Sequence, residues 1–99
     1  MKYSVLFILS FLVSVAASAK GTIRGSVIDH EGYPVISAVV QVEGTTIGTV
    51  TDLDGAFTLE VESGTYKINI SSMGFQAMSI EDVNVKEGEV SLLTDIQLQ

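Results

Sequence analysis

Residues 43–75, EGTTIGTVTDLDGAFTLEVESGTYKINISSMGF, constrain the fold of this 99-residue chain more than any other stretch. They contain three runs in which apolar side chains recur at every second position, separated by the segments DLDG (52–55) and ESG (62–64). Alternation with a period of two is typical of strands, and Asp and Gly tolerate the backbone of tight turns. The stretch therefore predicts a β-meander.

The first 19 residues have the three parts of a secretory signal. Lys2 gives a basic tip, residues 5–17 are apolar apart from two serines, and residues 17–19 (ASA) form a small-x-small cleavage site. A membrane anchor is the alternative, but a helix of this apolar run extends only about 20 Å, whereas a spanning helix crosses roughly 30 Å of hydrocarbon. We therefore expect a signal peptide over residues 1–19, export, and a mature chain without a transmembrane span.

The mature chain is acidic and lacks cysteine. The sequence has five Lys and Arg, one of them Lys2, and twelve Asp and Glu, so residues 20–99 carry a formal charge of 4 − 12 = −8. So few cations among so many acids cannot form the basic patch that nucleic acids require, and nucleic acid is excluded as a partner. With no Cys, neither disulfides nor a Cys-linked lipid anchor is available, and the apolar core alone must hold the domain together.

Apolar alternation continues beyond the meander and predicts about seven short strands in one domain over residues 20–99. The runs lie at residues 22–29, 38–43, 47–51, 56–61, 65–71, 75–80, 82–85 and 90–98. Short strands, turns every eight to twelve residues and no helical period are typical of a sandwich or small barrel. We predict an all-β sandwich with no helix after the signal.

Three further expectations concern the packing of these runs. Phe57 is predicted to anchor the core, and the apolar positions of the last run are expected to face the same way; these are Val90, Leu92, Ile96 and Leu98. The first run (22–29) and the last run (90–98) are candidates for sheet edges, where unpaired backbone groups accept a strand from another chain.

The mature chain also carries a series of short motifs. IxGxVxD begins at Ile23, AxVxV begins at Ala38, GTTxGTxTDxDGxFxL covers residues 44–59, and GTY and MGF follow. In this order and spacing the motifs resemble the carboxypeptidase regulatory-like domain family over nearly all of residues 21–98. The resemblance implies a prealbumin-like, or transthyretin-like, Greek-key β-sandwich of about seven strands.

The resemblance also implies a function. Domains similar to this one often stand at the N-terminus of TonB-dependent outer-membrane receptors as non-catalytic accessory modules. We therefore expect an interaction module in the periplasm or at the outer membrane, with an envelope protein or an outer-membrane receptor component as its partner. Eighty residues do not enclose a pore, so transport is not implied. An alternative is that the chain is the N-terminal fragment of a longer outer-membrane receptor.

The polar residues predict no catalytic set. The segment Asp52-x-Asp54-Gly55 is similar to the start of a calcium loop, but Ser63 stands where such a loop has a bidentate Glu, so a hairpin turn is preferred over a cation site. His30 is the only histidine, whereas hydrolytic zinc sites commonly use two. No Ser or Thr stands with a His and an Asp in a triad order. We predict no enzyme activity, no metal and no cofactor.

Three residues in or beside predicted loops are candidates for contact with a partner, namely Tyr33, Met73 and Phe75. The glycine between Met73 and Phe75 predicts a bend that presents one of them at the edge of the sandwich, although both side chains closing the core is the alternative. Tyr33 and Phe75 are also the aromatic residues left for a glycan platform, since Phe57 and Tyr66 are expected in the core. A carbohydrate-binding module is therefore an alternative function, with a glycan as partner.

Overall fold

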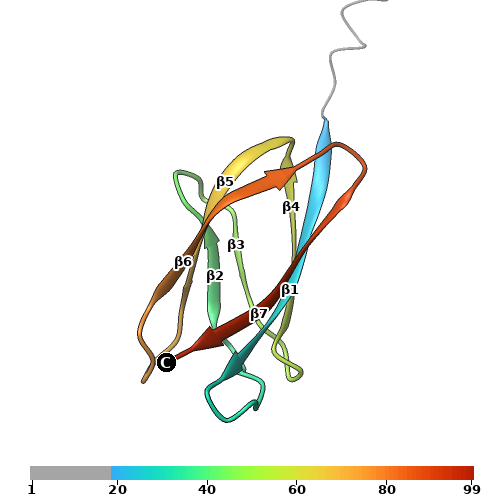
Figure 1. Ribbon diagram of the computed structural model, residues 1–99. Helices are drawn as coiled ribbons and strands as arrows, with labels where there is room; N and C mark the ends of the chain where they lie inside the picture. The colour runs from blue at the N-terminus through green and yellow to red at the C-terminus, as the bar shows by residue number, and fades with distance from the viewer. Residues whose placement is uncertain (1–18) are drawn as a thin grey trace, which may run out of the picture.

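The computed structural model describes residues 19–99, which form seven strands and no helix (Figure 1). The strands are β1 (Lys20–Asp29), β2 (Val39–Val42), β3 (Gly48–Val50), β4 (Ala56–Glu62), β5 (Gly64–Ser71), β6 (Met78–Val85) and β7 (Val90–Leu98). Residues 1–18 of the expected signal peptide lie outside the described residues. Over residues 19–99 the structure holds no helix of the length and apolarity needed to cross a membrane.

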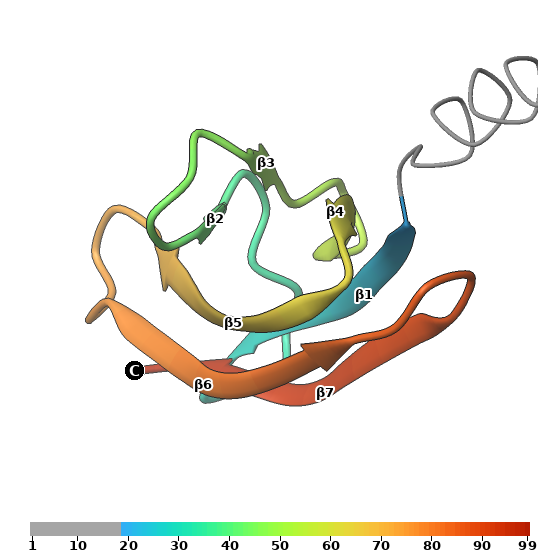
Figure 2. The same ribbon diagram turned by 90° about the horizontal axis from the view of Figure 1, so that it is seen from above.

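The strands form two sheets that face each other. One sheet has the order β4-β1-β7 and the other the order β3-β2-β5-β6. Viewed from above, β6 lies beside β7 on one side of the sandwich and β3 lies beside β4 on the other (Figure 2). The predicted all-β sandwich is confirmed, and its strands match the sequence because alternation in each run supplies one apolar face and one polar face.

The position of β1 differs from one of our expectations. β1 pairs with β4 in the antiparallel sense and with β7 in the parallel sense, so it is the central strand of its sheet. Of the two candidates for sheet edges, the first run is therefore not an edge, whereas β7 does lie at one. Alternation reports which face of a strand is buried, but both a central and an edge strand of a half-exposed sheet have that pattern.

The core lies between the sheets and consists almost entirely of aliphatic side chains from all the longer strands. Its buried members are Ile23, Val27, Val35, Ala38, Val40, Val42, Phe57, Leu59, Val61, Ile68, Ile70, Val83, Val85, Ile96 and Leu98. Fully burying one of the larger of these side chains stabilises the fold by about 1.5–3 kcal/mol. Phe57 is buried, as predicted, and packs against Gly25, where an added Cβ would lie 2.7 Å from the Phe57 Cζ.

Strand β7 changes phase halfway along its length. Opposite β1, Gly25 pairs with Leu93 and Val27 pairs with Ile96, so β7 has one residue more than β1 over this interval. Such a bulge moves the side chains that follow it to the other face. Leu92 is therefore 67% exposed while Ile96 is 1% exposed, and Leu93 packs on the core instead. The expectation that Val90, Leu92, Ile96 and Leu98 share one face is wrong.

The predicted runs 75–80 and 82–85 are joined in the single strand β6, except that residues 75–77 belong to the connection before it. The Phe75 N–H donates to the Ser72 carbonyl at 3.1 Å, so the chain reverses before β6 begins. Within β6, Asp82 has φ of 58°, close to a register shift against β5 between Tyr66 and Ile68. An irregularity inside one strand, rather than a turn between two strands, therefore separates the two apolar runs.

Thr51 is the one buried polar residue among those whose burial the structure describes. Its Oγ1 donates to the Val35 carbonyl at 2.6 Å and accepts from the Ala38 N–H at 2.8 Å. Its own N–H donates to the Ala38 carbonyl at 2.9 Å. Thr51 thus binds the β1–β2 connection to the end of β3, and its hydroxyl serves backbone groups that no strand pairing reaches.

Candidate interaction surface

The connection that follows β1 is a tight loop built on Asp29. The Asp29 Oδ1 accepts hydrogen bonds from the N–H groups of Glu31 at 2.8 Å and Tyr33 at 3.0 Å. The Asp29 N–H donates to the Tyr33 carbonyl at 2.8 Å, and Gly32 turns the chain with φ of 88°. The carboxylate therefore sets the shape of the loop, as Asp commonly does in turns, and fixes the backbone that carries Tyr33.

The connection between β3 and β4 repeats this geometry at Asp52. The Asp52 Oδ1 accepts from the N–H groups of Asp54 and Ala56, each at 2.9 Å, and the Asp52 N–H donates to the Ala56 carbonyl at 3.0 Å. Gly55 has φ of 74°. The two loops share the pattern Asp-x-(Glu/Asp)-Gly-x. The DLDG segment is a turn, as expected, but it joins strands of different sheets and so closes no hairpin. The β-meander predicted over residues 43–75 is therefore wrong, because β3, β4 and β5 alternate between the two sheets.

These two loops pack side by side. The Val27 N–H donates to the Gly55 carbonyl at 2.8 Å, and the Val27 carbonyl accepts from the Val35 N–H at 2.9 Å. A Cβ placed on Gly55 would lie 2.5 Å from the Val27 carbonyl oxygen and 3.1 Å from the Pro34 Cβ. The absence of a side chain at Gly55 therefore lets the second loop lie directly on the first.

The β5–β6 connection, residues 72–77, lies at the same end of the sandwich. Figure 1 shows it beside the C-terminus, at the end of the molecule where the β1–β2 and β3–β4 connections also lie. The Gln76 N–H donates to the Gln99 carbonyl at 2.7 Å, which holds this connection to the residue that follows β7. Three loops that are distant in sequence thus form one end of the domain.

This end carries exposed apolar side chains from all three loops. Tyr33 is 66% exposed, Ile36 51%, Leu53 78% and Met73 98%. We refer to these four residues as the loop-end surface. Of the nine exposed large apolar side chains recorded in residues 19–99, these four lie in the end loops, and two more, Val39 and Val50, pair across β2 and β3 where those strands meet the same end. The exposed apolar side chains are therefore unevenly distributed and favour one end of the domain.

The three residues predicted to contact a partner lie in these end loops. Tyr33 and Met73 are exposed and belong to the loop-end surface. Phe75 is half-buried and packs against the core cluster. The bend in the MGF segment thus directs Met73 outward, while Phe75 covers the end of the core.

Ile36 and Leu53 were not among the predicted contact residues. Leu53 lies between Asp52 and Asp54, in a turn whose other residues are chosen for their conformation. The sequence signal that could have identified Leu53 is the presence of an apolar residue inside an otherwise polar turn. Ile36 follows the buried Val35, and nothing in its local sequence distinguishes it from a core residue.

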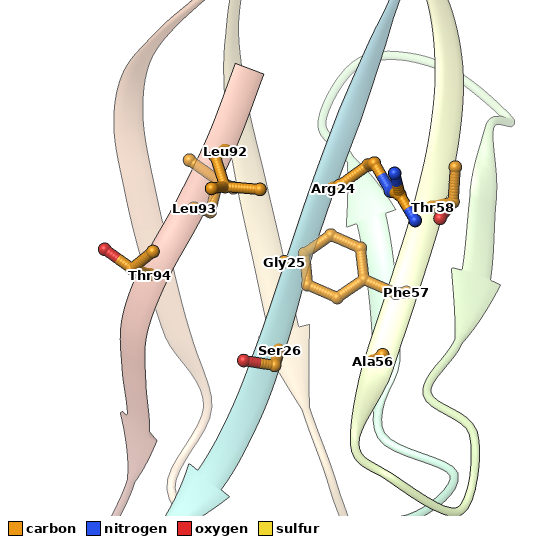
Figure 3. Close-up of a pocket in the computed structure, with 9 residues that line it drawn as sticks. All are labelled: Arg24, Gly25, Ser26, Ala56, Phe57, Thr58, Leu92, Leu93 and Thr94. Carbon is orange, nitrogen blue, oxygen red and sulfur yellow. The ribbon is translucent and has the colours of Figure 1, made fainter. Parts of the chain in front are cut away.

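The outer face of the β4-β1-β7 sheet has a shallow hollow, shown in Figure 3. Its rim is formed by Arg24, which pairs in register with Thr58 on β4 and Leu92 on β7, and by small residues such as Ser26 and Ala56. The Phe57 ring reaches across toward Gly25 but is buried, so it offers no face on which a sugar stacks. The hollow exposes hydroxyl groups and one guanidinium without an aromatic platform.

The polar side chains singled out from the sequence lie apart from one another or have structural roles. His30 is exposed in the first end loop, and Asp52 is engaged by two backbone N–H groups. Among the side chains that the structure describes, no three His, Asp or Glu are placed to hold a metal ion. The end loops thus combine Asp side chains that fix the loop backbone with apolar side chains that are exposed to solvent.

Sequence comparison finds matches over nearly the whole described domain. The model of the CarboxypepD_reg-like domain family matches residues 23–98. The TonB-dependent receptor SusC of Bacteroides thetaiotaomicron is 40% identical over 80 residues, which cover 80% of this chain and 8% of the receptor. The TonB-dependent receptor P39 of Formosa agariphila is 26% identical over 80 residues, covering 81% of this chain and 8% of that protein. The chain thus spans less than a tenth of the length of these relatives.

Solved structures show the same fold at low identity. A chain of a type II cohesin–X-dockerin complex from Acetivibrio cellulolyticus has a TM-score of 0.68 at 24% identity, covering 79% of this chain and 56% of that one. The TIE protein of Bacillus anthracis has a TM-score of 0.62 at 20% identity, covering 81% of this chain and 16% of that protein. At these identities the similarity extends to the β-sandwich alone.

Proposed function

Because this chain belongs to the CarboxypepD_reg-like domain family, we propose that it is a non-catalytic, exported module that binds another protein of the cell envelope through its loop-end surface. Its similarity to a TonB-dependent receptor implies an envelope location and a role like that of the β-sandwich modules of such receptors. An outer-membrane receptor component is accordingly the expected partner. The signal peptide expected over residues 1–19 is consistent with export.

One observation carries the proposal, namely the gathering of Tyr33, Ile36, Leu53 and Met73 at one end of the domain. Exposed apolar side chains from three separate loops, each loop fixed by its own hydrogen bonds, form a preorganised contact area. Apolar side chains grouped on a surface commonly mark a protein contact, whereas isolated ones need no explanation.

A glycan partner receives less support from the same residues. Tyr33 is the one aromatic side chain classed as exposed in residues 19–99, and the hollow on the three-stranded sheet has no exposed ring. Sugar recognition through an aromatic platform relies on ring faces that are open to the ligand. We therefore retain protein binding as the single proposed function.

Replacing Leu53 and Met73 together by Ser is expected to reduce partner binding about ten-fold or more, since losing two large apolar contacts from a binding surface commonly costs over 1 kcal/mol. The measurement is photo-crosslinking in cells that produce the full chain, with the reactive group in place of Ile36. Both side chains are exposed, so the melting temperature of the purified variant should stay close to that of the parent chain.

The matched control replaces Val90 and Leu92 by Ser, because these apolar side chains are also exposed but lie on the outer face of the three-stranded sheet. This control should leave the crosslinked product unchanged. Recovery of monomer alone from a reactive group at Ile36, or an equal loss of product in both double variants, would rule out the loop-end surface as the binding site.

A further inference from the structure

The end loops differ from the rest of the domain in charge as well as in apolar exposure. Asp29, Glu31, Asp52 and Asp54 all lie in the two Asp-based loops, and the last three are exposed. Residues 30–38, 51–55 and 72–77 contain no Lys or Arg. The apolar loop-end surface is therefore flanked by carboxylates with no Lys or Arg in the same loops.

The four carboxylates fall into two pairs with different roles. Asp29 and Asp52 each accept two backbone hydrogen bonds that shape their loops. Glu31 and Asp54 occupy the equivalent third position of each loop, where the backbone N–H, and not the side chain, is tied to the preceding Asp. These two side chains are exposed, and no hydrogen bond recorded in the loops uses them.

We infer that the occupant of the loop-end surface is a protein surface that presents Lys or Arg side chains around an apolar contact. This inference rests on the proposed function and specifies its partner. An apolar surface flanked by acids is complementary to an apolar surface flanked by bases, and the charges contribute mainly to association rate and to the choice of partner.

The same charges disfavour other occupants. A second copy of the chain docking end to end would bring two sets of carboxylates together, and like charges across an interface oppose association. An anionic lipid surface repels acids in the same way. A basic protein surface remains the occupant that satisfies both the apolar side chains and the charge.

The test is carbodiimide coupling, which joins a carboxylate to a Lys amine only at contact, performed on cells that produce the full chain. We expect a product in which Glu31 or Asp54 is joined to a Lys of another envelope protein. The double variant Glu31→Gln, Asp54→Asn should form at least about ten-fold less of this product than the parent chain. Photo-crosslinking from Ile36 in the parent chain should fall several-fold between roughly 0.05 and 0.5 M salt, because added salt shortens the range of exposed charges.

The matched control is Glu60→Gln, Glu62→Gln, which removes the same charge from the exposed face of β4 and should change neither product. Photo-crosslinking from Ile36 that persists undiminished in Glu31→Gln, Asp54→Asn and at high salt would overturn the inference while leaving the proposed function intact. A crosslinked dimer of this chain as the main product would also overturn it. A complete absence of photo-crosslinks from Ile36 would instead contradict the proposed function itself.

Discussion

Replacing Gly55 by Ala is expected to destabilise the domain by about 3 kcal/mol or more, which is a large part of the total stability of a domain of this size. Gly55 has φ of 74°, a conformation that costs Ala roughly 1 kcal/mol or more. In addition, the new Cβ would lie 2.5 Å from the Val27 carbonyl oxygen, so backbone must move. Thermal unfolding should show a fall in the melting temperature of about 12 °C or more.

Gly32→Ala is the matched control, since Gly32 holds the equivalent position of the other Asp-based loop. Its φ is 88°, but no atom lies within 4 Å of a Cβ placed there. The backbone cost alone should lower the melting temperature by about 5 °C. Equal effects of the two substitutions would mean that the contact between the loops, as opposed to their backbone conformation, contributes nothing to stability.

Replacing Thr51 by Val is expected to destabilise the domain by about 2–4 kcal/mol although the two side chains have the same shape. The substitution leaves the Ala38 N–H and the Val35 carbonyl without the hydroxyl that now pairs with both. Each buried group left unpaired costs about 1–3 kcal/mol. The free energy of unfolding in denaturant measures the loss, and the Ala38 amide should exchange its hydrogen faster than in the parent chain.

Thr51→Ser keeps the hydroxyl and removes one buried methyl group, so it should cost about 1 kcal/mol. The order of stability is therefore expected to be Thr, then Ser, then Val. If the methyl group of Thr51 contributed more to stability than its hydroxyl, the Val variant would be more stable than the Ser variant. That result would contradict the proposed role of the Thr51 hydroxyl in holding the β1–β2 connection.

Most strand positions follow from the sequence because burial between two sheets imposes an alternation that is visible residue by residue. The neighbours of each strand do not follow in this way. The central place of β1 depends on pairing with β4 and with β7, strands that begin 36 and 70 residues further along the chain. The phase change in β7 depends on one extra residue opposite the interval from Gly25 to Val27, which alternation within β7 alone does not locate.

The loop-end surface was only partly predictable for a related reason. Exposed apolar residues in loops are recognised when the surrounding sequence marks a turn, as it does for Tyr33 and Met73. Ile36 stands next to a buried Val, and its exposure results from the path that the chain takes beyond Pro34. The gathering of three loops at one end is a property of the topology, and no single segment contains it.

The parallel pairing of β1 and β7 has a mechanical consequence. The two strands run side by side over seven register pairs, with Lys20 at one end of the domain and Gln99 at the other. Tension applied through those two residues acts along the strands, so the bonds between them resist sliding collectively instead of breaking one after another. When the domain is stretched in this direction, β1 and β7 are loaded in shear, and the force that the domain withstands depends on its unfolding rate.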